Sequence, residues 1–184
     1  SSDVCSSDLA FFRRHGIWRV DNMSQLARAA ELYLKGWRPR QRRVVPISNS
    51  GAMCVMAADI AERIGMQLPP LAAGTQDRLK AVLPGFASFR NPVDITGALL
   101  SNSGLFGAVL PVLAEDPGVD MFLIGIPVAG EGYDLERFGV DTAQFADRTG
   151  KPVVVAALQD KVLAPFRSRG IPCFHDEADA DRKS

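Results

Sequence analysis

The chain has 184 residues, and its 47% of apolar residues is enough to fill the core of one large domain. The 21 basic residues equal the 21 acidic ones, which argues against a nucleic-acid binder, since such proteins usually carry a basic excess. No apolar run reaches the roughly 20 residues of a transmembrane helix, and three cysteines without a CxxC pair argue against a disulfide framework. We therefore expect a cytoplasmic protein that binds neither a membrane nor nucleic acid, with Cys54 and Cys173 as small buried apolar residues.

Both chain ends carry an unusual pattern. Ser1-Ser2-Asp3 recurs as Ser6-Ser7-Asp8, and the closing Asp181-Arg182-Lys183-Ser184 can be encoded by GAT CGG AAG AGC. The reverse complement of that DNA contains TCT TCC GAT, which encodes Ser-Ser-Asp. We therefore expect residues 1–9 and 181–184 to be scars of a synthetic oligonucleotide, and the natural protein to be longer. Genomic DNA with this sequence intact at both ends would refute that.

Residues 10–42 are predicted to form an entry helix and a linker. Asn22 followed by Gln25 fits a helix start. The apolar residues after it have helical spacing and form one face, namely Leu26, Ala29, Ala30, Tyr33 and Leu34. The basic cluster 38–43 is interpreted as a solvated linker rather than a nucleic-acid patch, because no aromatic residues are interleaved with it.

Residues 43–180 are predicted to form a single domain in which strands and helices alternate. The predicted strands are 44–48, 68–71, 121–126, 153–158 and 171–174. The predicted helices are 53–64, 75–83 with Thr75 as its cap, one that ends at 116–118, then 134–148 and 160–169. This alternation predicts an α/β fold: a doubly wound, mostly parallel, five-stranded, flavodoxin-like sheet with an extra N-terminal helix. Pro46 in a strand and Pro111 in a helix fit badly, and each predicts a kink or a shifted boundary.

The most informative segment is the loop Ser48, Asn49, Ser50, Gly51 and Ala52, where the first strand gives way to a helix. Gly51 tolerates close approach, and the amides of a first helical turn have no partner within the helix. Such amides, with the helix dipole, stabilise anions. The pattern predicts a phosphate site, although the spacing alone does not decide between a site and an ordinary loop.

A second polar loop, 91–97, also lies at the carboxyl ends of the predicted strands, where ligands collect in such sheets. Asn91, Asp94 and Thr96 are expected to order it, and Gly97 to permit unusual torsions. It could be the second wall of a phosphate-handling cleft. A long connection that needs turn residues and nothing more explains the same spacing, and Asp94 is more simply a turn brace than an acid–base group.

Four segments together resemble the succinyl-CoA-ligase-like domain of the NDP-forming acyl-CoA synthetases, the acetate–CoA ligase (ADP-forming) family, over residues 11–180. The first two are Gly16-Ile17-Trp18-Arg19-Val20-Asp21 and Ile47-Ser48-Asn49-Ser50-Gly51-Ala52. The third is Leu83-Pro84 followed by Asn91-Pro92-Val93-Asp94, and the fourth is Lys151-Pro152-Val153-Val154 with Gly170-Ile171-Pro172. Their order and spacing make the joint match more specific than any one of them.

The resemblance implies a ligase that interconverts acid, CoA and ATP with acyl-CoA, ADP and phosphate through an acyl phosphate and a phosphorylated histidine. Helix N-termini hold the phosphohistidine, so Ser50, Gly51 and Ala52 would offer such a helix start, shaped by Ser48 and Asn49. Ser50 and Ala52 depart from the commoner family pattern. CoA and ATP/ADP with Mg would serve the full-length enzyme, with no cofactor bound by this chain alone. CoA-binding and ATP-grasp domains, in the same protein or a partner subunit, would complete an enzyme that we expect to be oligomeric.

The chain lacks the family's phosphohistidine motif, which resembles SHTG, so we expect no catalytic residue and no metal site in it. His15 and His175 are interpreted as surface or hydrogen-bonded histidines. Two alternatives remain: a regulatory ligase-like domain of a protein lysine acetyltransferase, and a non-enzymatic module that binds phosphate or a small ligand. The absence of a GxGxxG motif argues against a dinucleotide.

Overall fold

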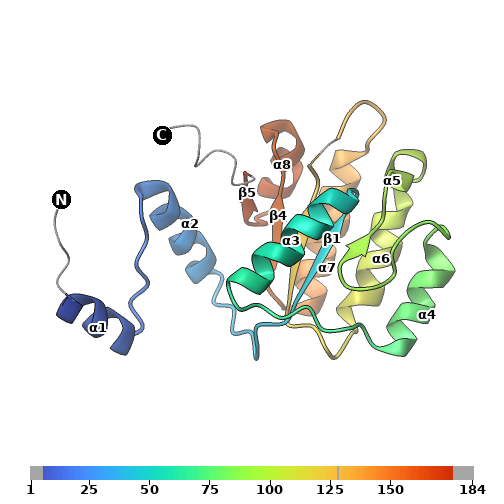
Figure 1. The fold of residues 1–184 in the computed structure, drawn as a ribbon. Helices are drawn as coiled ribbons and strands as arrows, with labels where there is room; N and C mark the ends of the chain where they lie inside the picture. Colours follow the sequence, from blue (N-terminus) through green and yellow to red (C-terminus); the bar gives the residue numbers. More distant parts are fainter. Residues whose placement is uncertain (1–5, 128, 176–184) are drawn as a thin grey trace. The chain divides into compact units, whose positions relative to one another are not determined.

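A computed structural model describes residues 6–127 and 129–175 of the chain (Figure 1). The chain divides into two compact units, Ser1–Gly36 and Trp37–Ser184. The first unit holds the helices α1 (Ser6–Arg14) and α2 (Met23–Leu34). The Asn22 side chain caps α2 by accepting from the Gln25 amide at 2.9 Å, as predicted, and Gln25 in return accepts from the Asp21 amide. No residue of α2 is buried, so its apolar face does not contribute to a core in this unit.

The second unit is built on a five-stranded sheet in which all strand pairs are parallel. The strands are β1 (Val44–Ser48), β2 (Val93–Asp94), β3 (Met121–Gly125), β4 (Val153–Ala156) and β5 (Cys173–Phe174). Their spatial order, β2-β1-β3-β4-β5, is the order of flavodoxin-like, doubly wound sheets. The predicted α/β architecture is therefore confirmed.

Helices connect these strands across both faces of the sheet. They are α3 (Gly51–Arg63), α4 (Ala73–Val82), α5 (Ala98–Ser101), α6 (Gly104–Ala114), α7 (Leu135–Thr149) and α8 (Asp160–Arg167). In Figure 1 α3 lies in front of the sheet, whereas α6 and α7 lie behind it. The packed core includes the side chains of Phe106, Phe122, Phe138 and Phe166, each less than 2% exposed. The α3 face is more open, because Val55, Met56 and Ile64 on it are exposed.

One predicted strand was wrong. Residues 68–72 form no strand; their neighbour Gln67 makes a single bridge with Arg43. Pro69 and Pro70 lack the N–H groups that a ladder needs. The fifth strand is instead β2, within the predicted second loop, where Val93 pairs with Ile47 and Asp94 with Ser48. The helix predicted at 75–83 begins earlier, at Ala73, and Thr75 is buried within it rather than capping it.

The two unusual prolines lie inside their elements rather than at a boundary. Successive residues of a strand direct their backbone N–H and C=O groups to opposite sides. The Arg43 carbonyl bonds on the β3 side and the Ser48 carbonyl on the β2 side, and Pro46, two residues before Ser48, faces the same side as Ser48. Its missing donor therefore faces the β2 side, where pairing begins only at Ile47, so no ladder bond is lost to β3. The lack of pairing on that side at Pro46 explains why a proline is tolerated within β1.

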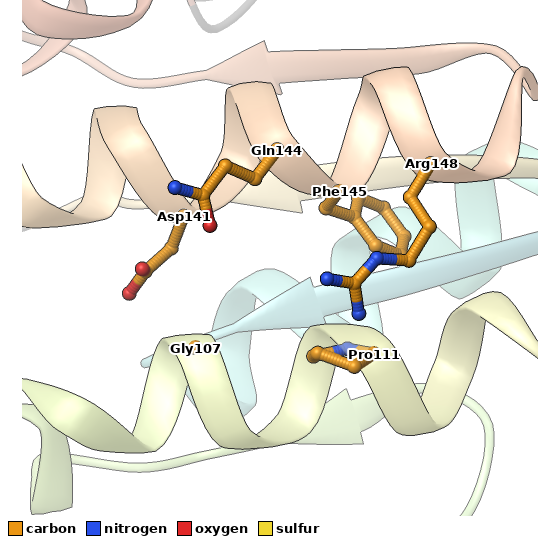
Figure 2. Close-up of a pocket in the computed structure, with 6 residues that line it drawn as sticks. All are labelled: Gly107, Pro111, Asp141, Gln144, Phe145 and Arg148. Carbon is orange, nitrogen blue, oxygen red and sulfur yellow. The ribbon is translucent and has the colours of Figure 1, made fainter.

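Pro111 lies in α6 opposite α7, beside a small cavity of about 30 Å³ (Figure 2). The proline leaves the Gly107 carbonyl without its usual helical donor. A side chain at Gly107 would come within 2.9 Å of the Asp141 carboxylate, so the two helices approach closely at this point. Burial raises the pKa of Asp141, against the opposing effect of Arg137.

Candidate phosphate site at the carboxyl end of the sheet

The loop Ser48–Ala52 lies at the carboxyl end of β1, and β1 lies between β2 and β3 in the sheet. In an order of 2-1-3-4-5, connections leave β1 and β3 in opposite directions, and ligands bind in the crevice outside such a switch point. The topology therefore places the predicted loop where doubly wound proteins bind their ligands.

The start of α3 has two amides that face outward. Ser50 caps the helix, its hydroxyl accepting from the Met53 amide at 3.5 Å, and its own amide donates to the Ser48 hydroxyl at 3.0 Å. The first helical bond runs from the Cys54 amide to the Ser50 carbonyl. Within the described part of the chain, the amides of Gly51 and Ala52 have no acceptor, and both residues are exposed. These two N–H groups, at the positive end of a 13-residue helix, can bind an anionic oxygen.

Gly51 lies close to the Asp94 side chain. A Cβ atom at position 51 would lie 3.0 Å from Asp94 Oδ2, which is tighter than ordinary contact. The pairing of Ser48 with Asp94 in the sheet brings the two predicted loops together at this point. The sequence suggested that a ligand would approach Gly51, but the group that does so is the Asp94 carboxylate. The sequence did not show this because β2, which brings Asp94 there, is only two residues long and follows a proline.

The second loop contains a strained residue, but it is not the glycine. Gly97 has φ −63°, which any residue adopts, whereas Thr96 has φ +63° in the left-handed region. The Thr96 amide donates to Asp94 Oδ1 at 2.8 Å, and the Thr96 hydroxyl accepts from the Ala98 amide at 3.3 Å. The expectation that Gly97 supplies the unusual torsion was wrong, since these two hydrogen bonds fix Thr96 in the bend instead.

The remaining predicted residues lie at different distances from the loop. The Asn49 amide group donates to the Tyr133 hydroxyl at 3.5 Å, so the α7 entry contacts the loop, a contact with no sequence signal. Asn91 donates to the carbonyl of Val44, at the opposite end of β1 from Ser48, and to that of Pro69. Asn91 therefore ties β1 to the 67–72 segment, while Asp94 and Thr96 lie beside the loop.

Cys54, His15 and His175 each have contacts of their own. Burial raises the pKa of the Cys54 thiol to about 12, with Asp94 adding to the effect, so this thiol stays protonated and unreactive. His175 contacts Asp160 at 3.1 Å on α8, and His15 stacks against Phe11. Among the residues that the structure describes, no cluster of three or more His, Cys, Asp or Glu side chains could hold a metal. None of the helices in the described ranges is long and apolar enough to cross a bilayer.

No protein-family model matches the sequence. Curated relatives include the trans-feruloyl-CoA synthase FCS1 of an unknown prokaryotic organism, 30% identical over 88% of this chain and 24% of the relative. The ADP-forming acetate–CoA ligase I of Archaeoglobus fulgidus is 31% identical over 94% of this chain and 24% of the ligase. The α subunit of the ADP-forming acetate–CoA ligase II of Pyrococcus furiosus is 28% identical over 92% of this chain and 38% of the subunit.

This chain is similar to a segment of these CoA ligases and synthases. The segment spans about a quarter of the first two relatives. Among solved structures, PH0766 from Pyrococcus horikoshii OT3 superposes with a TM-score of 0.82 at 22% identity, over 94% of this chain and 41% of that one. The dinucleotide-forming acetyl-coenzyme A synthetase 1 of Ca. Korarchaeum cryptofilum, solved in its apo form, gives 0.81 at 19% identity, over 95% of this chain and 39% of that one. These superpositions show the shared fold, and the names of the relatives do not favour the acetyltransferase alternative.

Proposed function

We propose that this chain is an internal domain of an ADP-forming acid–CoA ligase, which converts an acid, CoA and ATP to acyl-CoA, ADP and phosphate. Its own part is to hold a phosphohistidine, presented by another segment, at the start of α3. The observation that carries the proposal is the pair of exposed amides of Gly51 and Ala52 at the switch point of the sheet, which have no acceptor among the described residues. A solved protein of the same fold, an acetyl-coenzyme A synthetase, was determined in complex with phosphate and ADP, which agrees with phosphoryl chemistry in such proteins.

Backbone amides suit a group that must be bound and released in each cycle. They offer fixed donors and a partial positive charge without a cation that would hold the phosphoryl group too strongly. Ser48 fixes the loop by accepting from the Ser50 amide, and Ser50 fixes the first turn. The donors are thus oriented before the phosphoryl group arrives, which avoids reorganisation during the reaction.

Asp94 sets an upper limit on how strongly this site binds phosphate. Its Oδ2 lies close to Gly51, so a bound phosphoryl group would experience its negative charge. Its Oδ1 meanwhile accepts from the Thr96 amide and keeps the second loop beside the first. In this proposal Asp94 is a positioning residue that also weakens phosphate binding, which favours turnover over tight binding.

The partners in this proposal are the CoA-binding and ATP-grasp domains, in the same protein or another subunit, with Mg bound alongside ATP in the ATP-grasp domain, in a cytoplasmic and oligomeric enzyme. Parallel sheets are normally covered on both faces. Here Leu123 and Val154 are half-buried on the sheet, and Val55 and Met56 are exposed on α3. These apolar side chains are suited to contact with a neighbouring domain.

The test is CoA-thioester formation by the full-length protein that contains this chain, with Gly51→Val compared to Gly74→Val. Gly74 lies in the first turn of α4, and a Cβ there meets nothing within 4 Å, so it is a matched control. We expect Gly51→Val to lower kcat by on the order of 100-fold or more, as for loss of an oxyanion donor, and Gly74→Val to stay within about 2-fold. Phosphoenzyme formed from γ-labelled ATP should fall in parallel.

Two results would overturn the proposal. Full activity in Gly51→Val would show that the α3 amides do not hold the phosphoryl group. Absence of ADP-forming CoA ligation by the wild-type protein with every carboxylic acid in a broad panel would remove the assigned reaction itself.

A further inference from the structure

The opposite edge of the sheet contains a larger cavity, of about 400 Å³, at the amino ends of β1, β3 and β4. Its charged lining residues come from three separate segments: the linker before β1, the α6–β3 loop and the α7–β4 loop. They are Arg38, Arg40, Arg43, Asp120 and Lys151. Four cations and one carboxylate thus surround one cavity in a chain whose formal net charge is zero.

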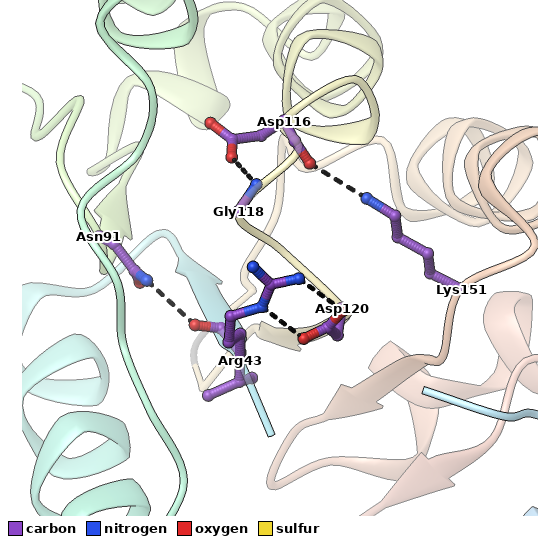
Figure 3. A network of polar contacts seen from close by, with 7 residues as sticks. Arg43, Asn91, Asp116, Gly118, Asp120 and Lys151 are labelled. Atoms are coloured by element: carbon purple, nitrogen blue, oxygen red, sulfur yellow. Dashed lines mark hydrogen bonds and ion pairs between the residues drawn. The ribbon is translucent and has the colours of Figure 1, made fainter. Parts of the chain in front are cut away.

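The one carboxylate, that of Asp120, pairs with one of the four cations, Arg43. Arg43 donates to both oxygens of Asp120, with Nε at 2.6 Å and Nη2 at 3.0 Å (Figure 3). Asp116, which lies next to the cavity, accepts from the backbone amides of Ala72 and Gly118 at 2.9 and 2.8 Å. These two acidic residues therefore hold the walls of the cavity together, and they do not neutralise the remaining cations by direct pairing.

Lys151 is held at the cavity wall by main-chain acceptors. Its Nζ donates to the carbonyl of Asp116 at 3.2 Å (Figure 3) and to that of Ala114, the last residue of α6, at 3.4 Å. The same Nζ lies 5.7 Å from the centroid of the Phe122 ring. An ammonium has three donors, so one is not used in these two hydrogen bonds. Burial lowers the pKa of Lys151, and the charges of Arg43 and Arg40 lower it further, while Asp116 and Asp120 oppose the shift.

The two linker arginines have unused donors. Arg38 donates to the carbonyl of its neighbour Trp37 at 3.0 Å, and Arg40 makes no hydrogen bond or ion pair with the residues that the structure describes. Like charges this close repel each other, and a ligand with two or more negative charges would relieve that repulsion. The volume falls within the range of about 300–1,000 Å³ that is typical of small-molecule sites.

We propose that this cavity is a second binding site, distinct from the loop at Gly51, for a small multivalent anion such as a polyphosphate or a polycarboxylate. Arg38 and Arg40, together with the charge of Lys151, bind the anion, and the Arg43–Asp120 pair keeps the cavity in shape. Its volume suits a compact anion rather than an extended acidic polymer. The inference does not depend on the proposed ligase function.

The test is calorimetric titration of the full chain with pyrophosphate and, separately, with citrate, at constant ionic strength and neutral pH. Matched variants are Arg40→Gln and Lys151→Met, with Arg137→Gln as control, because Arg137 lies at the start of α7 and pairs with Asp141. We expect saturable 1:1 binding to the wild type, at least 5-fold weaker in Arg40→Gln and in Lys151→Met, and unchanged in Arg137→Gln.

Arg40→Gln keeps the proposal testable even if Lys151→Met fails to fold, since Arg40 is exposed and makes no hydrogen bond or ion pair with the described residues. Binding of pyrophosphate without citrate would assign the site to phosphate compounds, and equal binding would assign it to multivalent anions generally. Equal loss of affinity in Arg137→Gln, or no saturable binding of either anion, would overturn the proposal. Amide shifts at Gly150 and Lys151, without shifts at Gly51, would separate this site from the first.

Discussion

The two edges of the sheet differ in the groups that carry positive charge, which are backbone amides at one edge and side-chain cations at the other. At the carboxyl edge, Gly51 and Ala52 offer backbone amides at a helix start, with Asp94 alongside. At the amino edge, helices end, and their carbonyls carry partial negative charge. Lys151 donates to the carbonyls at and just after the end of α6, so this side-chain cation stabilises the fold as well as lining the cavity. The comparison suggests that the amino edge contributes more to stability and the carboxyl edge more to the phosphoryl chemistry.

The largest expected effect is from removing Asp116 at the amino edge. Asp116 is 1% exposed and accepts from two amides in different segments, so Asp116→Ala should lower the free energy of unfolding by about 2 kcal/mol. Asp94→Ala at the carboxyl edge, which loses its bond from Thr96, should cost less than about 1 kcal/mol. Urea unfolding measures both. Equal losses would contradict the division between the edges.

A smaller effect is the acid sensitivity of the amino edge. The hydrogen bond from Arg43 holds the pKa of Asp120 below its ordinary value, with burial opposing the shift. Its stabilisation is therefore complete above the unfolded-state pKa of about 4 and is lost as pH falls through the folded-state value. Unfolding of Asp120→Asn between pH 6 and pH 2 should show a flatter dependence on pH than the wild type.

Asp160 provides the control for that experiment. Its pKa is also lowered, chiefly by Arg167, but its side chain is 74% exposed whereas that of Asp120 is 5% exposed. Added salt should therefore remove the contribution of Asp160 and leave most of that of Asp120. If added salt removed the stabilisation from Asp120 as fully as that from Asp160, the Arg43–Asp120 pair would not be shielded from solvent by the fold.

At the carboxyl edge the backbone strain at Thr96 can be relieved. A β-branched residue with φ +63° is unfavourable, and asparagine tolerates this conformation better. Thr96→Asn should raise the free energy of unfolding by about 0.5–1 kcal/mol, after some loss of the hydroxyl bond to the Ala98 amide. Thermal unfolding gives the measurement, with Thr75→Asn in the buried part of α4 expected to destabilise instead. Destabilisation by Thr96→Asn would indicate that the hydroxyl bond outweighs the strain.

The smallest expected effect concerns the charge of Asp94. Asp94→Asn keeps an oxygen that can accept from the Thr96 amide but removes the negative charge near Gly51. Phosphate should bind this variant a few-fold more tightly than the wild type, because one repulsive charge is lost. Weaker binding, measured by titration of the chain, would mean that Asp94 helps bind the anion through another route.

Local sequence patterns predicted the strands and helices wherever apolar spacing was strong. The central strands β1, β3 and β4 are continuous apolar runs, and Asn22, Gly65 and Gly150 mark helix ends. The errors occurred where tertiary pairing decides. Leu68–Leu71 is apolar but has two prolines, whereas Val93–Asp94 is too short to show a period yet pairs with β1.

The candidate loop could be predicted, but its surroundings could not. The change from an apolar strand to Ser50-Gly51 and an apolar helix signals a helix start. The closeness of Asp94 and Tyr133 depends on strand register and on how α7 enters, which no local pattern encodes. The basic cavity is similar: the cluster at 38–43 was interpreted as a solvated linker, because Lys151 is more than a hundred residues away in the sequence.

The most direct test is a titration of isotopically labelled chain with inorganic phosphate, followed through the backbone amide resonances. Our interpretation predicts saturable shifts at Gly51 and Ala52 that are lost in Gly51→Val and kept in Gly74→Val. Phosphate that shifts other amides while those of Gly51 and Ala52 stay unchanged would contradict the central claim.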